Sequence, residues 1–587
     1  MRSRGRACRL GEIVSVINHY VLNSERRGWG VTKVLNRRQA TLALASAGIA
    51  AAVSRSGRGR ANPAAPDPVI KTSLGSVRGL EQNGVLRFLG VPYGAPTGGT
   101  ARFLPPRPAA PWSGVRDARQ YGDSCPQVPL GTSPFVRKST AEAPTPPSAM
   151  QKQLGTLFAR PSPEPQLSES CLVLNVWTAA TDSAKRPVMV WLHGGGFAVG
   201  SGSAPAYDGT PLAARGDVVV VTINHRLNVF GHLYLGELAG EAFSQSGNAG
   251  MLDVVEALRW VRDNIAAFGG DPGNVTIFGE SGGAGKVSVV CAMPAAKGLF
   301  HKAIMQSGPC LQIADKARGT AIARQLLSDL HLSSNQIGEL QALDAMKLAA
   351  AADAAEVKVV PRVLGFGPMG MIPLVDGSVI HHDPFDKVAA PESAEVPFLV
   401  GSTKDEAVLF VGPFPQWGQF SEAEVLDRLR PMAGQRAEEA LRLYKKLRPA
   451  DSLSYLLVDA VTDYWMRQAA NRVAELKVQQ KRAAAYVYVL DWEINHDLRC
   501  PHGTDVSLVF DNPHASPAIG GATDALKVAD QMSAAWVAFA HSGNPNNPKL
   551  PHWPAYALQS RANMAFDSRS RVVSDYGREA REFWEKG

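Results

Sequence analysis

The body of this chain carries almost no net charge, and that absence excludes a first class of function. The 587 residues have a net charge of +8, but residues 1–64 alone hold twelve Lys and Arg against two carboxylates, a net of +10. The remaining 523 residues therefore carry −2, and no basic stripe among them argues for nucleic acid. With 45% hydrophobic and 19% charged residues, the composition favours a large buried core over disorder.

A long apolar run is also missing from the first 64 residues. Residues 40–53 are uncharged and rich in Ala and Leu, but a membrane-spanning helix needs about 20 apolar residues. This run follows Arg37-Arg38 and precedes a Pro/Ala-rich segment, an order typical of a twin-arginine export signal. We predict a leader at 1–64, cleaved between residues 50 and 65, on an exported, periplasmic or secreted protein without a stable membrane anchor. The alternative is a chance arginine pair before a buried helix.

Cysteine and cofactor motifs are scarce. Six cysteines occur, five of them after the leader, and an exported protein meets an oxidising compartment that permits at least one disulfide. The three glycines at 194–196 are not followed by Gly-Lys-Ser/Thr, so they do not form a phosphate-binding loop. No cluster of metal ligands stands out either. The sequence therefore predicts chemistry that needs no metal or nucleotide cofactor.

What the chain does contain is an alternation of apolar runs and helical patterns. Short runs biased toward β-branched residues lie at 188–192, 217–223 and 275–278, and further runs at 303–305, 398–400 and 485–490. Between the second and third runs, residues 251–268 have apolar side chains at helical spacing. Strand, helix, strand is the βαβ unit, so we predict an α/β fold with a mainly parallel central sheet flanked by helices.

The remaining patterns complete this picture of one domain. Segments near 315–355 and 421–480 are rich in Ala, Leu and charged residues, and are expected to form an inserted helical cap and outer helices. Residues 126–168 are rich in Pro and Ser and are expected to form a long surface loop. We therefore predict a single domain over 65–587.

Ser281 lies in the pattern Gly279-Glu280-Ser281-Gly282-Gly283. The pattern directly follows the predicted strand 275–278 and precedes residues 284–290, which can begin a helix. A serine on so tight a strand-to-helix turn needs small neighbours, because its strained backbone crowds the adjacent chain. The helix that follows directs amide N–H groups toward the same place. Ser281 is therefore the candidate nucleophile.

A glycine turn supplies the second element of such a site. His193-Gly194-Gly195-Gly196-Phe197 ends an earlier predicted strand, and successive glycines let backbone amides face a substrate without obstruction. The alternative is a merely flexible turn. With a nucleophile turn downstream, we expect the amides of Gly195, Gly196 and Gly282 to form an oxyanion hole.

Position alone leaves the acid and the base open. In hydrolases with such a serine turn, the acid and then the histidine follow the nucleophile along the chain. Glu406 and its neighbour Asp405 both follow the predicted strand 398–400, and position cannot choose between them. His502 is favoured as the base because it lies at a loop end before Gly503. The histidines late enough in the chain are His496, His502, His514, His541 and His552.

Together these motifs resemble the type-B carboxylesterases, the family that includes para-nitrobenzyl esterases and cholinesterases. The likeness runs from about residue 69 to residue 584. Besides the serine pattern it includes residues 168–176 (SESCLVLNV), 264–272 (NIAAFGGDP), 404–406 (KDE), 502–503 (HG) and 536–540 (WVAFA).

The resemblance implies roles for particular residues. It selects Glu406 as the acid and His502 as the base, and it implies a buried ion pair between Arg102 and Glu169. Further implications are a Cys125–Cys171 disulfide, a secondary polar network of Glu280 and Ser307, and pocket positions at Leu409 and Phe410.

Departures from the family pattern are few. Ser170 stands where an Asp is usual, Asp505 where a Glu usually follows His-Gly, and Gly282 where an alanine is common. Residues 126–170 lack the tryptophan on which cholinesterases bind their cationic substrate, so a choline ester is disfavoured. Cys310 and Cys500 flank Ser307 and His502 in sequence, and either two separate thiols or a second disulfide fits them.

The expected function is hydrolysis of a small-molecule carboxylic ester through a covalent acyl-enzyme on Ser281. Hydrolysis of an amide, carbamate or lactone by the same residues is the alternative, since the acyl step is shared. A non-catalytic binding protein of the same fold is a more distant alternative.

Overall fold

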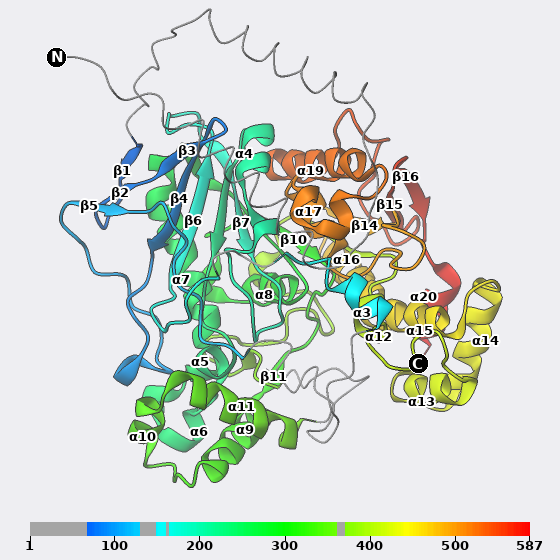
Figure 1. The fold of residues 1–587 in the computed structure, drawn as a ribbon, viewed down its shortest axis with the longest axis horizontal. Coiled ribbons are helices and arrows are strands. Elements are labelled where there is room, and N and C mark those ends of the chain that lie inside the picture. Colours follow the sequence, from blue (N-terminus) through cyan, green and yellow to red (C-terminus); the bar gives the residue numbers. More distant parts are fainter. Residues whose placement is uncertain (1–66, 129–147, 160–163, 361–369, 587) are drawn as a thin grey trace, which may run out of the picture. The chain divides into compact units, whose positions relative to one another are not determined.

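An eleven-stranded mixed sheet organises the fold, and helices cover it (Figure 1). The computed structural model describes residues 67–128, 148–159, 164–360 and 370–586, which belong to one unit, Asp67–Gly587. The predicted export leader lies outside these residues. The strand order is β16-β15-β14-β13-β10-β9-β7-β8-β6-β4-β3. The strands of this sheet are β3 (Leu80–Gln82), β4 (Val85–Pro92), β6 (Val173–Thr178), β7 (Arg186–Leu192), β8 (Val219–Ile223), β9 (Gly270–Glu280), β10 (Lys302–Gln306), β13 (Phe398–Thr403), β14 (Ala485–Leu490), β15 (Ala562–Phe566) and β16 (Arg571–Ser574).

The centre of the sheet is parallel, as predicted. Strands β8, β7, β9, β10, β13, β14 and β15 pair in parallel, with Met189 opposite Thr276 and Ile304 opposite Phe278. Five of the six predicted apolar runs fall within β7, β9, β10, β13 and β14, and the run 217–223 begins two residues before β8. Antiparallel pairs occur only toward the two edges of this sheet, among β3, β4, β6 and β8 and between β15 and β16.

The central strands are apolar throughout because both faces of the sheet are buried. All seven residues of β7 are buried. Val188 and Val190 pack in one core cluster and Met189 and Trp191 in another, because successive strand residues point to opposite faces. Alternation between hydrophobic and polar residues is therefore absent here, which is the pattern expected of a covered parallel sheet.

The helices also follow the predicted segments. Segment 315–355 contains α9, α10 and α11, and Asp315 and Asp344 cap the first and last of these. Segment 421–480 contains α13 to α16, interrupted by a π-helical turn at Asp463–Arg467. The helices are α3 (Ala149–Leu154), α4 (Thr210–Gly216), α5 (Asn228–His232), α6 (Gly236–Ala239), α7 (Ala249–Asn264), α8 (Gly282–Cys291), α9 (Lys316–Asp329), α10 (Ile337–Ala342), α11 (Ala345–Val359), α12 (Val408–Val411), α13 (Glu422–Ala433), α14 (Ala437–Leu447), α15 (Leu453–Thr462), α16 (Gln468–Gln479), α17 (Thr504–Val509), α18 (Pro517–Gly520), α19 (Ala525–Ser542) and α20 (Arg578–Glu585).

Smaller elements lie outside the main sheet. Strands β1 (Val69–Lys71), β2 (Ser76–Arg78) and β5 (Val115–Asp117) form a second sheet, and β11 (Ala314–Asp315) pairs with β12 (Leu374–Val375). Helix α3 lies within the segment 126–168 that the sequence suggests is a loop, and Ser148 and Gln151 form a capping box at its start. Among the described helices, none is long and apolar enough to cross a membrane.

Two arginine–carboxylate ion pairs lie in the interior of the protein. Nε and Nη2 of Arg102 contact both carboxylate oxygens of Glu169, at 2.7 and 2.5 Å, which confirms the predicted ion pair. Arg226 and Asp253, both buried, form a second two-point pair at 2.8 and 2.7 Å that the sequence did not reveal. Breaking such a pair by removing one partner would leave a buried charge unpaired and cost about 3–5 kcal/mol.

Candidate active site

Ser281 occupies a strained turn between β9 and α8, at the carboxyl end of the parallel strands. Its backbone has φ 56° and ψ −125°, a region that residues other than glycine rarely adopt, at a cost of about 1–3 kcal/mol. Its amide donates to the Gln306 carbonyl (2.9 Å), and its carbonyl accepts from the Gly285 amide (3.1 Å). A side chain on Gly283 would overlap the Leu192 carbonyl, so the pattern needs glycine there. The neighbouring chain thus holds the serine in this geometry.

His502 and Glu406 meet on two loops that follow neighbouring strands. His502 lies between β14 and α17, and Glu406 lies between β13 and α12. Nδ1 of His502 is 2.6 Å from Oε2 of Glu406, and both side chains are buried. The other oxygen of Glu406 accepts from the Thr403 amide at 2.7 Å. The carboxylate is therefore fixed on one side and orients the imidazole on the other.

The rival acid points elsewhere. The Asp405 carboxylate accepts from the Cys500 amide (3.2 Å) and lies 3.8 Å from the Arg499 guanidinium. Two rival histidines are also placed by the structure: the His496 side chain is 95% exposed, and His541 contacts the Gly216 carbonyl through Nε2 at 3.0 Å. Of the two adjacent carboxylates, Glu406 is therefore the one that meets His502 at hydrogen-bond distance.

The second ring nitrogen of His502 faces Glu280. Nε2 lies 3.2 Å from Oε1 of Glu280, but neither atom is oriented for a hydrogen bond, and Nε2 has no hydrogen-bond partner among the described residues. Burial lowers the pKa of His502, but Glu280 and Glu406 outweigh it and raise this pKa to about 9. Burial raises the pKa of Glu280, while the neighbouring His502 lowers it. The site thus holds a nitrogen that can take up a proton, beside a carboxyl group that favours its cation.

The glycine turn packs directly on the serine turn. Gly195 and Gly196 have φ +87° and +63°, which glycine adopts without strain. A side chain on Gly194 would meet Glu280 and Ser281, and one on Gly282 would overlap the Gly196 carbonyl. The amides of Gly195, Gly196 and Gly282 donate no hydrogen bond to any residue that the structure describes. Three free donors thus lie around the serine turn.

A polar network lies behind the serine and the histidine. Ser307 has φ 53° and donates its amide to the Gly401 carbonyl (2.9 Å), while its hydroxyl has no partner within the described part of the chain. Asp505 accepts from Tyr488 (2.6 Å) and from the Gln306 side chain (3.0 Å), and burial raises its pKa to about 6. Gln306 was not predicted from the sequence to belong to this network. The signal that could have identified it is its position directly before Ser307, at the end of β10.

Aromatic side chains border His502. The Phe410 ring, on α12, lies 4.9 Å from the His502 ring and 5.6 Å from the Trp465 ring, and Leu409 precedes it. Trp465 lies on the π-helical turn, which gives no sequence signal because it depends on hydrogen-bond geometry rather than on residue spacing. The Phe158 ring lies where a side chain on Gly503 would stand.

The predicted Cys125–Cys171 disulfide is not present: both residues are buried free thiols. The two thiols are in hydrogen-bond contact, and this contact together with burial raises the pKa of Cys171. Cys125 also accepts from the Leu227 amide (3.3 Å) and donates to the Pro126 carbonyl (3.7 Å). Cys310 and Cys500 are free thiols as well, which corrects the alternative of a second disulfide.

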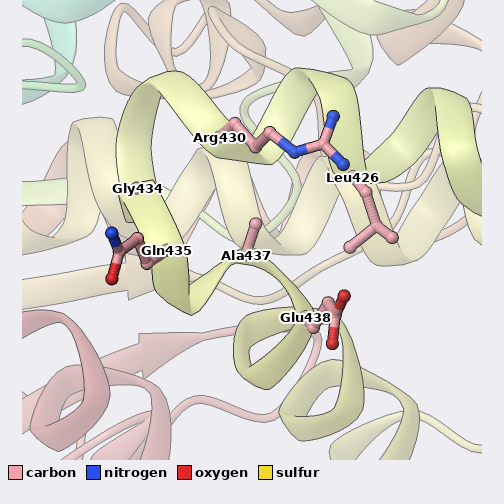
Figure 2. Close-up of a pocket in the computed structure, with 6 residues that line it drawn as sticks. All are labelled: Leu426, Arg430, Gly434, Gln435, Ala437 and Glu438. Atoms are coloured by element: carbon pink, nitrogen blue, oxygen red, sulfur yellow. The ribbon is translucent and has the colours of Figure 1, made fainter.

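A hollow of about 350 Å³ lies elsewhere, at the turn between α13 and α14, lined by Leu426, Arg430, Gly434, Gln435, Ala437 and Glu438 (Figure 2). No residue of the serine or histidine loops lines it, so it is separate from the site around Ser281 and His502. Within the described part of the chain, no group of three or more His, Cys, Asp or Glu residues is placed to hold a metal ion.

A parallel sheet with a strained serine at the carboxyl end of a central strand, and a histidine–carboxylate pair on later loops, defines an α/β-hydrolase. The model of the carboxylesterase family matches residues 66–584, and the chain belongs to this family. It is a type-B carboxylesterase, a carboxylic ester hydrolase.

Known relatives cover nearly the same length. The para-nitrobenzyl esterase of Bacillus subtilis (strain 168) is 35% identical over 524 residues, spanning 88% of this chain and 98% of that protein. The phenmedipham hydrolase of Pseudarthrobacter oxydans is 32% identical over 524 residues, spanning 87% and 97%. The crystal structure of the carboxylesterase EST55 of Geobacillus stearothermophilus at pH 6.2 is 37% identical, with a TM-score of 0.74 and coverage of 88% and 99%.

Proposed function

We propose that this carboxylesterase hydrolyses its ester through an acyl-enzyme on Ser281, with His502 as general base and acid and Glu406 as the orienting carboxylate. One observation carries the proposal: Nδ1 of His502 is tied to Glu406 at 2.6 Å, while its buried Nε2 has no hydrogen-bond partner among the described residues. A base held this way presents its free nitrogen to a hydroxyl proton.

The two steps balance as follows. His502 takes the Ser281 proton as the serine oxygen bonds to the ester carbonyl carbon, and the alcohol leaves with the proton from His502. Water then attacks the acyl-enzyme, giving its proton to His502, and the carboxylic acid leaves as Ser281 recovers a proton. Each step passes through a negatively charged carbonyl oxygen.

The free amides of Gly195, Gly196 and Gly282 support an oxyanion hole for that oxygen. Donors aimed at a developing charge need no reorganisation during the reaction, and loss of one typically costs about 3 kcal/mol. Glu280 and Ser307 would act behind the histidine: Glu280 favours its cation, and the Ser307 hydroxyl offers an unused hydrogen-bond group.

Leu409 and Phe410 are the proposed pocket residues, because the Phe410 ring packs against His502. The substrate is a small-molecule ester; the same residues would also serve an amide, carbamate or lactone. Replacing Phe410 with Ala should raise KM for aryl esters more than for acetate esters of small alcohols, measured on a panel that also contains the matching amides. Equal changes in KM across all the substrates would show that Phe410 is not a pocket residue.

Labelling tests the nucleophile. A para-nitrophenyl alkylphosphonate should inactivate the enzyme and release one nitrophenolate per chain, with the phosphonyl mass on the peptide that contains Ser281. A label on another residue would refute the proposal.

A further inference from the structure

Lys286 is a buried cation outside the proposed mechanism. It lies on α8, one helical turn after Gly282, and its side chain is fully buried. Among the described residues, no carboxylate forms an ion pair with it. Burial of an unpaired ammonium is costly, so the hydrogen bond that Lys286 makes within the described part of the chain is its main compensation.

That bond reaches the glycine turn. Nζ of Lys286 donates to the His193 carbonyl at 2.8 Å, and His193 directly precedes Gly194-Gly195-Gly196. No other hydrogen bond within the described residues reaches this carbonyl from a loop or a side chain. Nζ also lies 5.8 Å from the centre of the Phe197 ring, on the other side of the turn. One side chain on the helix that carries the Gly282 amide thus contacts both ends of the loop that carries the other two amides.

We propose that Lys286 is a positioning residue, whose bond to the His193 carbonyl holds the amides of Gly195 and Gly196 in register with Ser281. This inference rests on the proposed oxyanion hole and adds a residue that positions its donors and lies outside the motifs that carry the family resemblance. The bond fixes the peptide group between His193 and Gly194, which leads into the two that carry the donor amides. In those two, the Gly194 carbonyl lies 2.9 Å from Nδ1 of His193, and the Gly195 carbonyl accepts from the Ala198 and Val199 amides (3.3 and 3.1 Å).

The electrostatic surroundings support a role that changes with pH. The titratable groups that face Lys286 are His193 directly after β7, His225 after β8 and His232 on α5, and burial keeps the pKa of all three below the ordinary value. Burial also lowers the pKa of Lys286, to about 7. Near neutral pH the lysine is therefore the group that changes charge here. The ammonium donates a stronger hydrogen bond than the amine, so the anchor is tighter below pH 7.

Lys286→Met removes the bond and keeps the volume, and Lys477→Met is its matched control. Lys477 is also fully buried on a helix, α16, and also donates to backbone carbonyls, those of Ser393 and Ala394, at 2.7 Å each. We expect Lys286→Met to lower kcat about ten- to hundredfold for a nitrophenyl ester, with KM within about threefold, since oxyanion contacts act on the transition state. Lys477→Met should keep kcat.

Two further readouts separate positioning from folding. A trifluoromethyl ketone, which forms an oxyanion adduct with the serine, should bind Lys286→Met more weakly by the same factor as kcat/KM falls. The ratio of wild-type to variant kcat should decrease as pH rises through 7, as the lysine loses its charge. Lys286→Gln, whose side chain is one atom shorter and uncharged, should lose kcat too and replaces the methionine variant if that one does not fold.

Wild-type kcat in either folded Lys286 variant would overturn the inference. So would an equal loss in Lys477→Met, or a kcat ratio that does not change with pH. Failure of the underlying mechanism looks different: Ser281→Ala would then remain active and the ketone would bind it normally.

Discussion

Oε1 of Glu280 lies 3.2 Å from Nε2 of His502, the ring nitrogen that Glu406 does not contact. A carboxylate at that distance stabilises the imidazolium and so raises the pKa of His502, which here reaches about 9. The neutral imidazole is the active base, so kcat/KM should rise with pH up to this value.

Glu280→Gln should therefore move the acidic limb of the kcat/KM profile to lower pH. Loss of the negative charge lowers the pKa of His502, and the neutral base forms sooner as pH rises. The profile is measured from pH 5 to 10 with a nitrophenyl ester, and Glu438→Gln, on the exposed face of α14, is the control. If the acidic limb of the Glu280→Gln profile lies at the same pH as in the wild type, Glu280 does not raise the pKa of His502.

The adjacent carboxyls Asp405 and Glu406 give a matched pair of variants. Glu406→Gln should lower kcat by about 10⁴-fold, since the amide cannot hold the imidazole in the required tautomer. Asp405→Asn should leave kcat within about tenfold, because Asp405 contacts Cys500 and Arg499 rather than His502. Steady-state kinetics on both variants measure the two effects, and melting temperatures confirm that both variants fold. A larger loss of kcat in Asp405→Asn than in Glu406→Gln would make Asp405 the orienting carboxylate instead.

Gly282 stands where alanine is common in the family, but we expect an alanine here to reduce activity. A methyl group at this position would overlap the Gly196 carbonyl, so the glycine turn must shift away from the serine. Gly282→Ala should therefore lower kcat about ten- to hundredfold, by misplacing oxyanion donors. Gly338→Ala, on α10 with open space around it, is the control. Full activity of Gly282→Ala would mean that the turn adapts freely.

Export is a proposal that rests on the leader sequence alone. Replacing Arg37-Arg38 with two lysines should keep esterase activity inside the cytoplasm of an expressing bacterium, because the twin-arginine route reads the pair. Fractionation with a cytoplasmic marker measures this. If the variant with two lysines is exported as well as the wild type, Arg37-Arg38 is not an export signal.

Much of the architecture could be predicted from the sequence, because central strands buried on both faces form unbroken apolar runs. Residues 188–192 and 485–490 are such runs, and both are strands at the centre of the sheet. The serine turn could be predicted as well, since its strain demands the glycines around it. The edge strands were not predicted: β3 and β5 have three residues each, too few to show a period.

Most contacts between distant residues had no signal in the sequence, and the Arg102–Glu169 pair was expected only from the family resemblance. Position along the chain left Asp405 and Glu406 equal; the difference is that one carboxylate faces His502 and the other Arg499. Neither the Arg226–Asp253 pair nor the Lys286 bond to His193 has a local sequence signal, because each joins segments that meet only in the fold. The family resemblance implied a disulfide between Cys125 and Cys171, but both are free thiols.

Hydrolysis of a para-nitrophenyl ester by Ser281→Ala tests the central claim most directly. Only the serine oxygen is lost, and the glycine turn, His502 and Glu406 remain in place. We expect kcat to fall by about 10⁴-fold or more, with an unchanged melting temperature showing that the fold is intact. A Ser281→Ala enzyme that kept kcat within about tenfold of the wild type would contradict it.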